Sequence, residues 1–455
     1  MDAPWFDELA ELLRIPSISA DPAHAGDVVR AAEWVAAFVR DAGGTCEVVN
    51  WEGQPLAVGE IRASGGADGA PTVLCYGHFD VQPVSPLELW ESPPFEPELR
   101  DGYLYGRGTV DDKGQLYMLL AAARELAAAG ALPVNVRFCC DGEEETGGSS
   151  IVDFLAADDR GADAAVVFDS SMIRRGLPAF NIATRGLAYF HVTVRTGKRD
   201  LHSGVFGGAA LNAAHALLET LSGLLARDGR LAEPLRKGVV PPTAGELAGW
   251  RELPAGADEL REQGARPADP SAADEFYLRT FGEPALDVNG IETGSPHLQK
   301  TVLPVEAVAN LSIRLAPGQR VDEIAPAVER LLHESAPEGA ELTVELLSSS
   351  PPGLVPPDSP AIRLGLDAFE RALGRRPALI RSGGTIPIVP ALAAKSIPAI
   401  VTGFGLPDSQ IHSPNERLLA EYVPLGIGAA RDLYRELAHL PGAGADGETT
   451  ATDAS

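Results

Sequence analysis

The chain has 455 residues, of which 45% are hydrophobic and 22% charged, a composition typical of a globular protein with more than one domain. Its formal net charge of −27 argues against a nucleic acid or an anionic membrane as a partner, because such binding needs clustered Lys and Arg. The N-terminus has no signal-peptide pattern, and no stretch is apolar enough to span a membrane. We therefore expect a cytoplasmic protein.

The first part of the chain alternates between helix and strand patterns, and its strands are mostly apolar. In chain order the expected elements are a helix over 31–42, strands over 45–50 and 72–76, a helix over 116–130, a strand over 134–140, a helix over 151–157 and a strand over 164–168. Apolar strands separated by helices indicate an α/β domain with a mostly parallel central sheet flanked by helices.

The pattern changes near Gly186, where half-exposed strands replace apolar ones. The expected elements are strands over 189–195, 308–315 and 341–347 and helices over 207–225 and 323–334, with a long Pro- and Gly-rich connection over 230–270. Alternating strands indicate an α+β unit whose sheet is open on one face. We interpret this unit as a lid or dimerisation domain inserted into the first domain.

After residue 350 the pattern of the first domain resumes, with helices over 362–373 and 422–437 and a strand over 399–403. We therefore predict a discontinuous first domain over 1–184 and 351–440 and a lid or dimerisation domain over 185–350. The tail over 441–455 has almost no apolar residues and is expected to be disordered.

Five segments place an acid or a histidine just after an apolar strand or in a Gly-rich turn, where open α/β sheets bind their ligands. The segments supply His78, one of the pair Asp111 and Asp112, one of the glutamates at 143–145, Asp169 and His412. Histidine and carboxylate are zinc ligands, and one carboxylate can bridge two ions, so the set predicts a pair of zinc ions. The residues alone leave the choice between the two adjacent aspartates open.

Neighbouring residues have the chemistry that such a site uses. Asp80, two residues after His78, has the spacing to accept a hydrogen bond from the imidazole and to orient its ring. In the acidic run, one glutamate can bind metal while its neighbour serves as a general base. Each residue alone has a simpler role, as a structural histidine, a helix cap or a solvated acid, but their convergence favours the metal site. The chain has no GxSxG motif for a serine mechanism.

Six motifs occur in a fixed order along nearly the whole chain: GHFDVQP, GRGTVDDKG, EEETG, LHSGVFGG, GGTIP and HSPNE. At these residues the chain resembles the co-catalytic di-zinc metallopeptidase family of the carnosinases, peptidase V, glutamate carboxypeptidases, aminoacylases and the succinyl-diaminopimelate and acetylornithine deacylases. The DVQP, DDKG and LHSGVFGG motifs are most similar to those of the dipeptidase branch.

The resemblance implies a role for each residue of the predicted metal site. It implies two Zn²⁺ per subunit, with His78 and Asp169 on one ion, Glu145 and His412 on the other, and Asp111 as the bridge. It also implies that Glu144 is the general base and acid and that Asp80 orients His78, whereas Glu143 is an additional carboxylate that leaves the choice of base open. Mn²⁺ and Co²⁺ are alternatives to zinc, because sites of this type accept several divalent ions.

The resemblance also extends to the inserted domain. His202, in LHSGVFGG, is implied to reach the active site of the partner subunit and to stabilise the oxyanion there, so we expect a homodimer. Arg314, Thr301 and Thr385 match positions that bind the carboxylate of the substrate, an anion that the fork of an Arg side chain suits. Without the resemblance, a turn histidine and a surface salt bridge would be the simpler interpretations of His202 and Arg314.

The predicted function is that of a metal-dependent hydrolase for dipeptides or short peptides with a free C-terminal carboxylate. Two zinc ions and the Glu144 base would activate the attacking water. The first alternative is a deacylase of N-acyl amino acids, which needs the same ions and a different pocket. The second is a non-catalytic metal-binding protein of the same fold.

Overall fold

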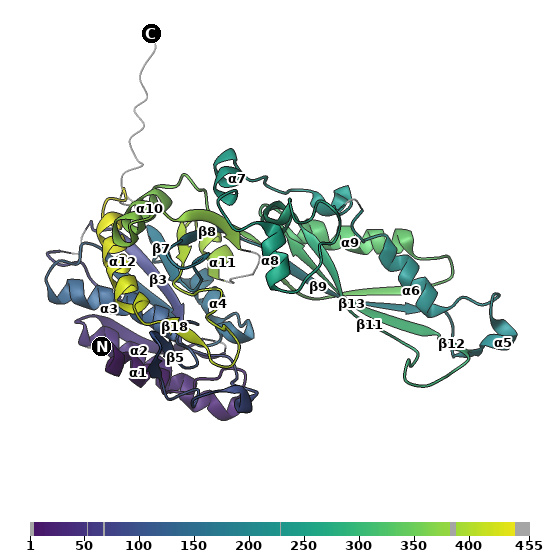
Figure 1. Ribbon diagram of the computed structural model, residues 1–455, viewed down its shortest axis with the longest axis horizontal. Helices are drawn as coiled ribbons and strands as arrows, with labels where there is room; N and C mark the ends of the chain where they lie inside the picture. Colours follow the sequence, from purple (N-terminus) through teal and green to yellow (C-terminus); the bar gives the residue numbers. More distant parts are fainter. Residues whose placement is uncertain (1–3, 52, 67–68, 228, 383–387, 442–455) are drawn as a thin grey trace, which may run out of the picture. The chain divides into compact units, whose positions relative to one another are not determined.

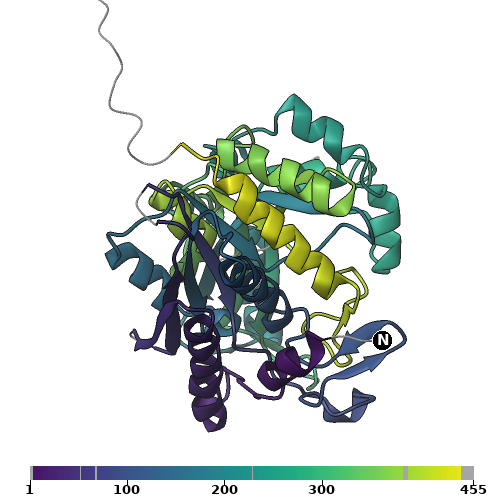
Figure 2. The same ribbon diagram turned by 90° about the vertical axis from the view of Figure 1, so that its left-hand side faces the viewer.

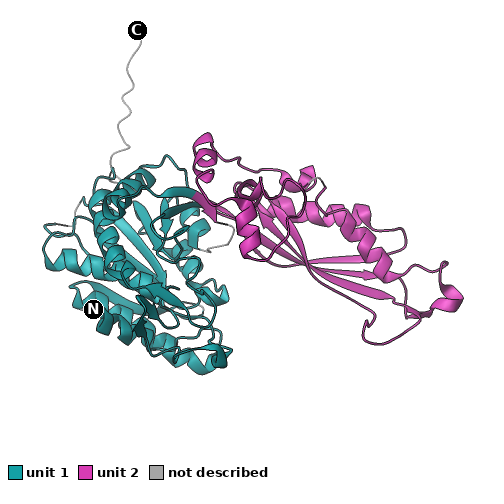
Figure 3. Cartoon of the chain, viewed as in Figure 1, with its two compact units in different colours: residues 1–182, 355–379, 387–455 teal, residues 183–354, 380–386 magenta. Residues whose placement is uncertain are grey.

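The computed structural model describes residues 4–51, 53–66, 69–227, 229–382 and 388–441. The chain forms two compact units (Figure 3): unit 1 comprises residues 1–182, 355–379 and 387–455, and unit 2 comprises residues 183–354 and 380–386. The limits predicted from the sequence are 184/185 and 350/351, and the catalytic and lid roles of the two units stay predictions. The predicted disordered tail lies outside the described residues, except for Pro441.

A central sheet whose middle strands are parallel forms the core of unit 1 (Figure 1). The strand order is β1 (Thr45–Asn50), β2 (Pro55–Ile61), β6 (Asn135–Asp141), β3 (Thr72–His78), β7 (Ala164–Phe168), β17 (Ala399–Thr402), β8 (Ala179–Thr184) and β15 (Gly353–Leu354), with β16 (Ala378–Ser382) paired to β8. The ladders β6–β3, β3–β7 and β7–β17 are parallel. The predicted α/β class with a mostly parallel sheet is confirmed.

Helices cover both faces of this sheet because its middle strands are apolar on both sides. Helix α12 (Tyr422–Leu437) packs between α3 (Lys113–Ala128) and α10 (Pro360–Leu373) on one face, and α4 (Ser150–Ala157) packs with α11 (Ile388–Ala394) on the other (Figures 1 and 2). Helix α1 (Phe6–Leu13) contacts α3, and α2 (Ala25–Asp41) contacts β1 and β2. No helix in the described part of the chain has the length and hydropathy needed to cross a membrane.

A small antiparallel sheet in unit 1 joins two loops that are distant in the sequence. Strand β18 (Arg417–Leu419) pairs with β5 (Tyr103–Tyr105), which also pairs with β4 (Glu98–Arg100). This pairing holds the segment that follows His412 beside the loop that leads to Asp111.

Unit 2 has an antiparallel sheet in the order β11 (Ala285–Thr293), β13 (Glu306–Leu315), β9 (Gly186–Arg195) and β14 (Glu341–Ser350). Buried residues alternate along β9, as expected for a sheet with one covered face. Helices α6 (Ala213–Ser222) and α9 (Val321–Ser335) pack on this face and bury a core that includes Val192, Leu217 and Leu311. A separate two-stranded sheet pairs β10 (Leu201–His202) with β12 (Val302–Leu303).

Two local predictions in unit 2 were wrong. The predicted helix over 207–225 forms only over α6 (Ala213–Ser222), because Gly208 has a φ of +78° and Asn212 caps the helix by accepting from Ala214 N. A separate short helix, α5 (Ser203–Phe206), precedes the predicted range. The predicted irregular connection contains α7 (Ala244–Trp250) and α8 (Gly256–Glu262). A capping box between Thr243 and Glu246 begins α7.

Candidate metal centre

The five predicted metal ligands all belong to unit 1 and come from the carboxyl ends of its strands or from the loops beside them. His78 is the last residue of β3, Asp169 follows β7, Asp111 precedes α3, Glu145 lies in the turn after β6, and His412 lies between β17 and β18. Parallel strands end at the same edge of a sheet, which is why segments so distant in the sequence converge here.

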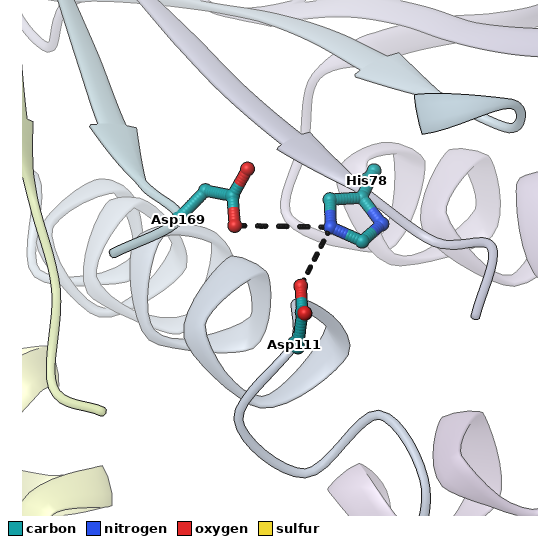
Figure 4. Close-up of side chains that lie close together, drawn as sticks. All are labelled: His78, Asp111 and Asp169. Carbon is teal, nitrogen blue, oxygen red and sulfur yellow. Dashed lines mark hydrogen bonds and ion pairs between the residues drawn. The ribbon is translucent and has the colours of Figure 1, made fainter. Parts of the chain in front are cut away.

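The first ligand group consists of His78, Asp111 and Asp169. Figure 4 shows both carboxylates directed at one nitrogen of His78: Nε2 lies 3.0 Å from Asp111 Oδ1 and 3.8 Å from Asp169 Oδ1. The His78 side chain is 0% exposed. Burial disfavours its charged form, but the hydrogen bond with Asp111 and the nearby carboxylates of Asp169 and Asp80 outweigh burial and raise the pKa of His78 well above its usual range.

The second ligand group consists of Asp111, Glu145 and His412. His412 Nε2 lies 2.9 Å from Asp111 Oδ2 and 3.1 Å from Glu145 Oε2. Hydrogen bonds with these two carboxylates raise the pKa of His412 to about 10. Asp111 therefore presents one oxygen to each histidine, which is the arrangement that a bridging carboxylate needs.

Asp112 has a different position from Asp111, a choice that the residue types alone left open and that the resemblance made in favour of Asp111. Its Oδ2 accepts a hydrogen bond from the backbone N–H of His78 at 3.1 Å, and the peptide between the two aspartates is cis. A Cβ at Gly77 would lie 2.7 Å from this oxygen, so only glycine fits there. Burial raises the pKa of Asp112 well above its usual range. Asp112 thus supports the backbone of the ligand His78 and belongs to neither ligand group.

The three consecutive glutamates have three different environments. Glu145 contacts His412, as described above, and Glu143 accepts a hydrogen bond from Ser150 N at 2.8 Å at the start of α4. Glu144 is half-buried, and burial together with the nearby carboxylates Asp169 and Glu145 raises its pKa to about 8. A carboxyl group with such a pKa can exchange a proton near neutral pH.

Asp80 contacts one residue of each ligand group, His78 and Glu145. Its Oδ1 lies 3.3 Å from His78 Nδ1, and its Oδ2 accepts hydrogen bonds from Ser19 Oγ at 2.6 Å and from Glu145 N at 3.1 Å. A carboxylate in this position fixes the ring of a ligand histidine and leaves Nε2 directed at the ion. His78 Nδ1 is also hydrogen-bonded to the backbone oxygen of Asp80 at 3.2 Å, so the orienting role of the Asp80 carboxylate stays a prediction.

The donor set fits two divalent cations. Each histidine presents Nε2 to two carboxylate oxygens, a combination of N and O ligands that zinc accepts. The surrounding acids repel one another: burial and the charge of Asp80 raise the pKa of Asp141 to about 7. Positive ions would relieve this repulsion.

The remaining predicted residues do not belong to either ligand group. His202 and Thr301 lie together in unit 2, where Ser203 N donates to Thr301 O at 3.0 Å beside the β10–β12 pair. Arg314 lies on β13 of the same unit, paired in register with Leu187. Thr385 lies outside the described residues. The predicted contacts of these residues with a substrate or a partner subunit stay predictions.

Two residues that support the ligands were not identified from the sequence, although both belong to quoted motifs. Gln82, in DVQP, donates to Glu145, and Glu416, in HSPNE, accepts from the loop that carries Asp111. Glu416 also accepts from Arg107 Nη1 at 2.6 Å and Val110 N at 3.0 Å. The only signal was their proximity to predicted ligands, because a buried partner cannot be read from spacing.

Residues 74–436 match the family described as peptidase family M20/M25/M40. Among curated relatives, the human Beta-Ala-His dipeptidase is 30% identical over 383 residues, which cover 81% of this chain and 75% of that protein. The Cys-Gly metallodipeptidase of Schizosaccharomyces pombe is 29% identical over 463 residues, or 95% of each chain.

Two solved structures extend the similarity to the fold. The crystal structure of human carnosine dipeptidase 1 has a TM-score of 0.74 at 26% identity and covers 96% of each chain. An M20 family metallo-carboxypeptidase from Sulfolobus solfataricus has a TM-score of 0.81 at 24% identity, with 96% of this chain and 100% of that chain covered.

Proposed function

The chain belongs to peptidase family M20/M25/M40 and is therefore a peptidase, and from this membership we propose that it is a two-zinc dipeptidase. The observation that carries the proposal is the Asp111 carboxylate, which presents one oxygen to His78 and the other to His412. The names of the two curated relatives specify Beta-Ala-His and Cys-Gly as their substrates. Small dipeptides with a free carboxylate are thus the substrate class for this chain.

His78, Asp111 and Asp169 would hold one ion, and Asp111, Glu145 and His412 the other. When bound, such a pair of ions lowers the pKa of a water molecule and polarises the scissile carbonyl. Glu144 takes the proton of the attacking water on its carboxylate and returns it to the leaving amine. Asp80 keeps the ring of His78 in position during the reaction.

The proposal includes a homodimer, in which His202 acts at the partner subunit's site, and a cytoplasmic location. His202 is exposed, and its Nδ1 accepts a hydrogen bond from Gly204 N at 3.0 Å. A neutral imidazole with an accepting Nδ1 carries its proton on Nε2, so the ring is ready to donate to an oxyanion. Arg314, Thr301 and Thr385 complete the proposal as the residues that bind the substrate carboxylate.

The test is hydrolysis by metal-stripped protein with and without added Zn²⁺ or Mn²⁺. The panel contains Beta-Ala-His, Cys-Gly and other dipeptides beside N-acetyl and N-succinyl amino acids. Metal-dependent cleavage of dipeptides supports the proposal. Cleavage of the acyl substrates alone favours a deacylase, and two bound ions without turnover of any substrate favour a non-catalytic metal-binding protein.

A further inference from the structure

Gln82 lies just beyond the carboxyl end of β3, and its amide is directed at Glu145. Its Nε2 donates to Glu145 Oε2 at 2.8 Å and to the backbone oxygen of Glu145 at 3.2 Å. The backbone N–H of Gln82 donates to Glu145 Oε1 at 3.2 Å. One residue therefore contacts both carboxylate oxygens and the main chain of Glu145, which fixes the side chain relative to its own backbone.

The other contacts of Glu145 make Gln82 the main support for its orientation. Asp80 accepts from Glu145 N and so fixes the backbone, but it does not contact the carboxylate. His412 contacts Glu145 Oε2 from a loop, and its side chain is 53% exposed. His412 is half-exposed and contacts one oxygen of Glu145, whereas Gln82 is partly buried and contacts both oxygens. Gln82 also follows directly after Val81, whose backbone N–H donates to Ser17 O at 2.9 Å.

Gln82 also distinguishes Glu145, a ligand in the second group, from Glu143, which is in neither group. Its side chain and backbone N–H are both used on Glu145, whereas Glu143 is occupied at the start of α4 by Ser150 N. A neutral amide donor is suited to this task, because it orders a carboxylate without neutralising the charge that attracts a cation.

We infer that Gln82 is a positioning residue that holds Glu145 in the geometry of a metal ligand and thereby sets the affinity of the second ligand group. The inference rests on the proposed function, since it requires two ions in the site. The first ligand group does not use Glu145, so Gln82 acts on one of the two ions. Loss of the amide removes the hydrogen bonds to Glu145 Oε2 and to the Glu145 backbone oxygen and leaves only the backbone N–H of Gln82 on Oε1. The carboxylate of Glu145 is then held less firmly, and the binding of that ion weakens.

The experiment compares metal binding by wild type and Gln82→Met, which keeps the length of the side chain and removes its donors. Metal-stripped full-length protein is titrated with Zn²⁺ in a calorimeter, and Mn²⁺ loading is followed by electron paramagnetic resonance to separate single from coupled ions. We expect the affinity for the ion at the second ligand group to fall about 10- to 100-fold, the usual effect of removing a residue that orients a ligand. The affinity for the ion at the first ligand group should change less than about threefold.

Gln319→Met in unit 2 is the matched control. Gln319 is also a buried amide: its Oε1 accepts from Ala316 N at 2.9 Å, and its Nε2 donates to Leu235 O at 2.9 Å and Lys237 O at 3.0 Å. Its loss is expected to lower the thermal stability of the metal-free protein without changing either zinc affinity. This control separates a general loss of stability from an effect on the ligand Glu145.

Three outcomes are distinguishable. Two ions in wild type and a selective loss of the second in Gln82→Met support the inference. Two ions in both proteins with equal affinities, or an equal weakening of both ions, overturns the inference and leaves the proposed function intact. A wild type that binds fewer than two ions overturns the two-zinc proposal itself and the inference with it.

Discussion

The two ligand groups use the same kinds of side chain but are built from different parts of the fold. In the first group, the side chain of His78 is 0% exposed at the end of a central strand that is paired on both sides. In the second, the side chain of His412 is 53% exposed and lies in a loop. The first ligand group is therefore built on the central sheet, whereas the second depends on polar contacts that hold the loop of His412 in place.

The backbone of this loop is strained where it carries the ligand. His412 has a φ of +60°, and Gln410 and Asn415 have values of +58° and +65°. Such conformations cost roughly 1–3 kcal/mol each in residues other than glycine and persist only where the surroundings enforce them. The side chain of Asn415 supplies two hydrogen bonds, donating to Leu89 O and accepting from Glu91 N, both at 2.8 Å. Glu416 supplies another, to the loop of Asp111.

The largest expected effect removes what the two groups share. Asp111→Ala deletes a ligand from both groups and so weakens the binding of both ions. We expect kcat/KM to fall by more than about ten-thousandfold, because losing both ions should cost more than losing one acid–base group, which supplies up to about that factor. Metal-stripped protein titrated with Zn²⁺ should bind both ions more weakly. Two tightly bound ions in this variant would contradict the bridging role of Asp111.

Next in size is the loss of the proposed base. Glu144→Gln should lower kcat about 100- to 10,000-fold, because proton transfer to and from water is lost while the ligands remain. Both ions should still bind, as measured by metal analysis of the purified protein. Glu143→Gln is the control: it should change kcat little, because the Glu143 carboxylate is used by Ser150 N. A larger loss of kcat in Glu143→Gln than in Glu144→Gln would show that Glu143, and not Glu144, is the general base.

Glu416→Ala tests whether the loop of His412 depends on its polar contacts, because it removes the contact between that loop and the loop of Asp111. Glu416 and Arg107 form an ion pair whose side chains are 0% and 1% exposed, and the loss of one partner from a buried pair costs about 3–5 kcal/mol of unfolding free energy. We expect this loss in urea unfolding and, in addition, weaker binding of the ion at His412.

A matched pair of similar burial exists in unit 2, where Glu246 and Arg381 are each 2% exposed. Glu246→Ala should lose similar stability without affecting zinc binding. If both variants weaken zinc equally, the proposed link between Glu416 and the second ligand group is wrong.

The smallest expected effect is a pH dependence of the metal-free protein. Hydrogen bonds with Asp111 and Glu145 raise the pKa of His412 to about 10, above its value of 6.5 in an unfolded chain. Below pH 6.5 the imidazole is protonated in both states, so the stabilisation is fully present there. It is lost as the pH rises toward 10, because only the unfolded state releases the proton readily.

Chemical unfolding of metal-free wild type and His412→Ala between pH 6 and 10 measures this term. Other groups that titrate in the same range cancel in the difference between the two proteins. The stability of wild type should fall more steeply than that of the variant. Parallel curves would show that His412 is not paired with the two carboxylates in solution.

Much of the fold followed from local patterns. Apolar runs at Val73–Tyr76 and Ala164–Phe168 are typical of central parallel strands, and the structure has β3 and β7 there. The fold class of both units and the position of candidate ligands at strand ends could therefore be predicted. The start of α6 at Ala213 instead of at 207 could not, because it depends on a positive φ at Gly208 and a cap at Asn212.

The sequence by itself determined the types of residue at the site and the edge of the sheet where they meet, because a buried parallel strand directs whatever follows it to that edge. The residue types alone did not separate Asp111 from Asp112 or the three adjacent glutamates from one another, and the resemblance only implied their roles; the contacts that distinguish them come from the tertiary structure. These distinctions depend on side chains distant in the sequence, such as Gln82 on Glu145 and Glu416 on the loop of Asp111. Such contacts arise from how the loops pack together, and no local periodicity contains that information.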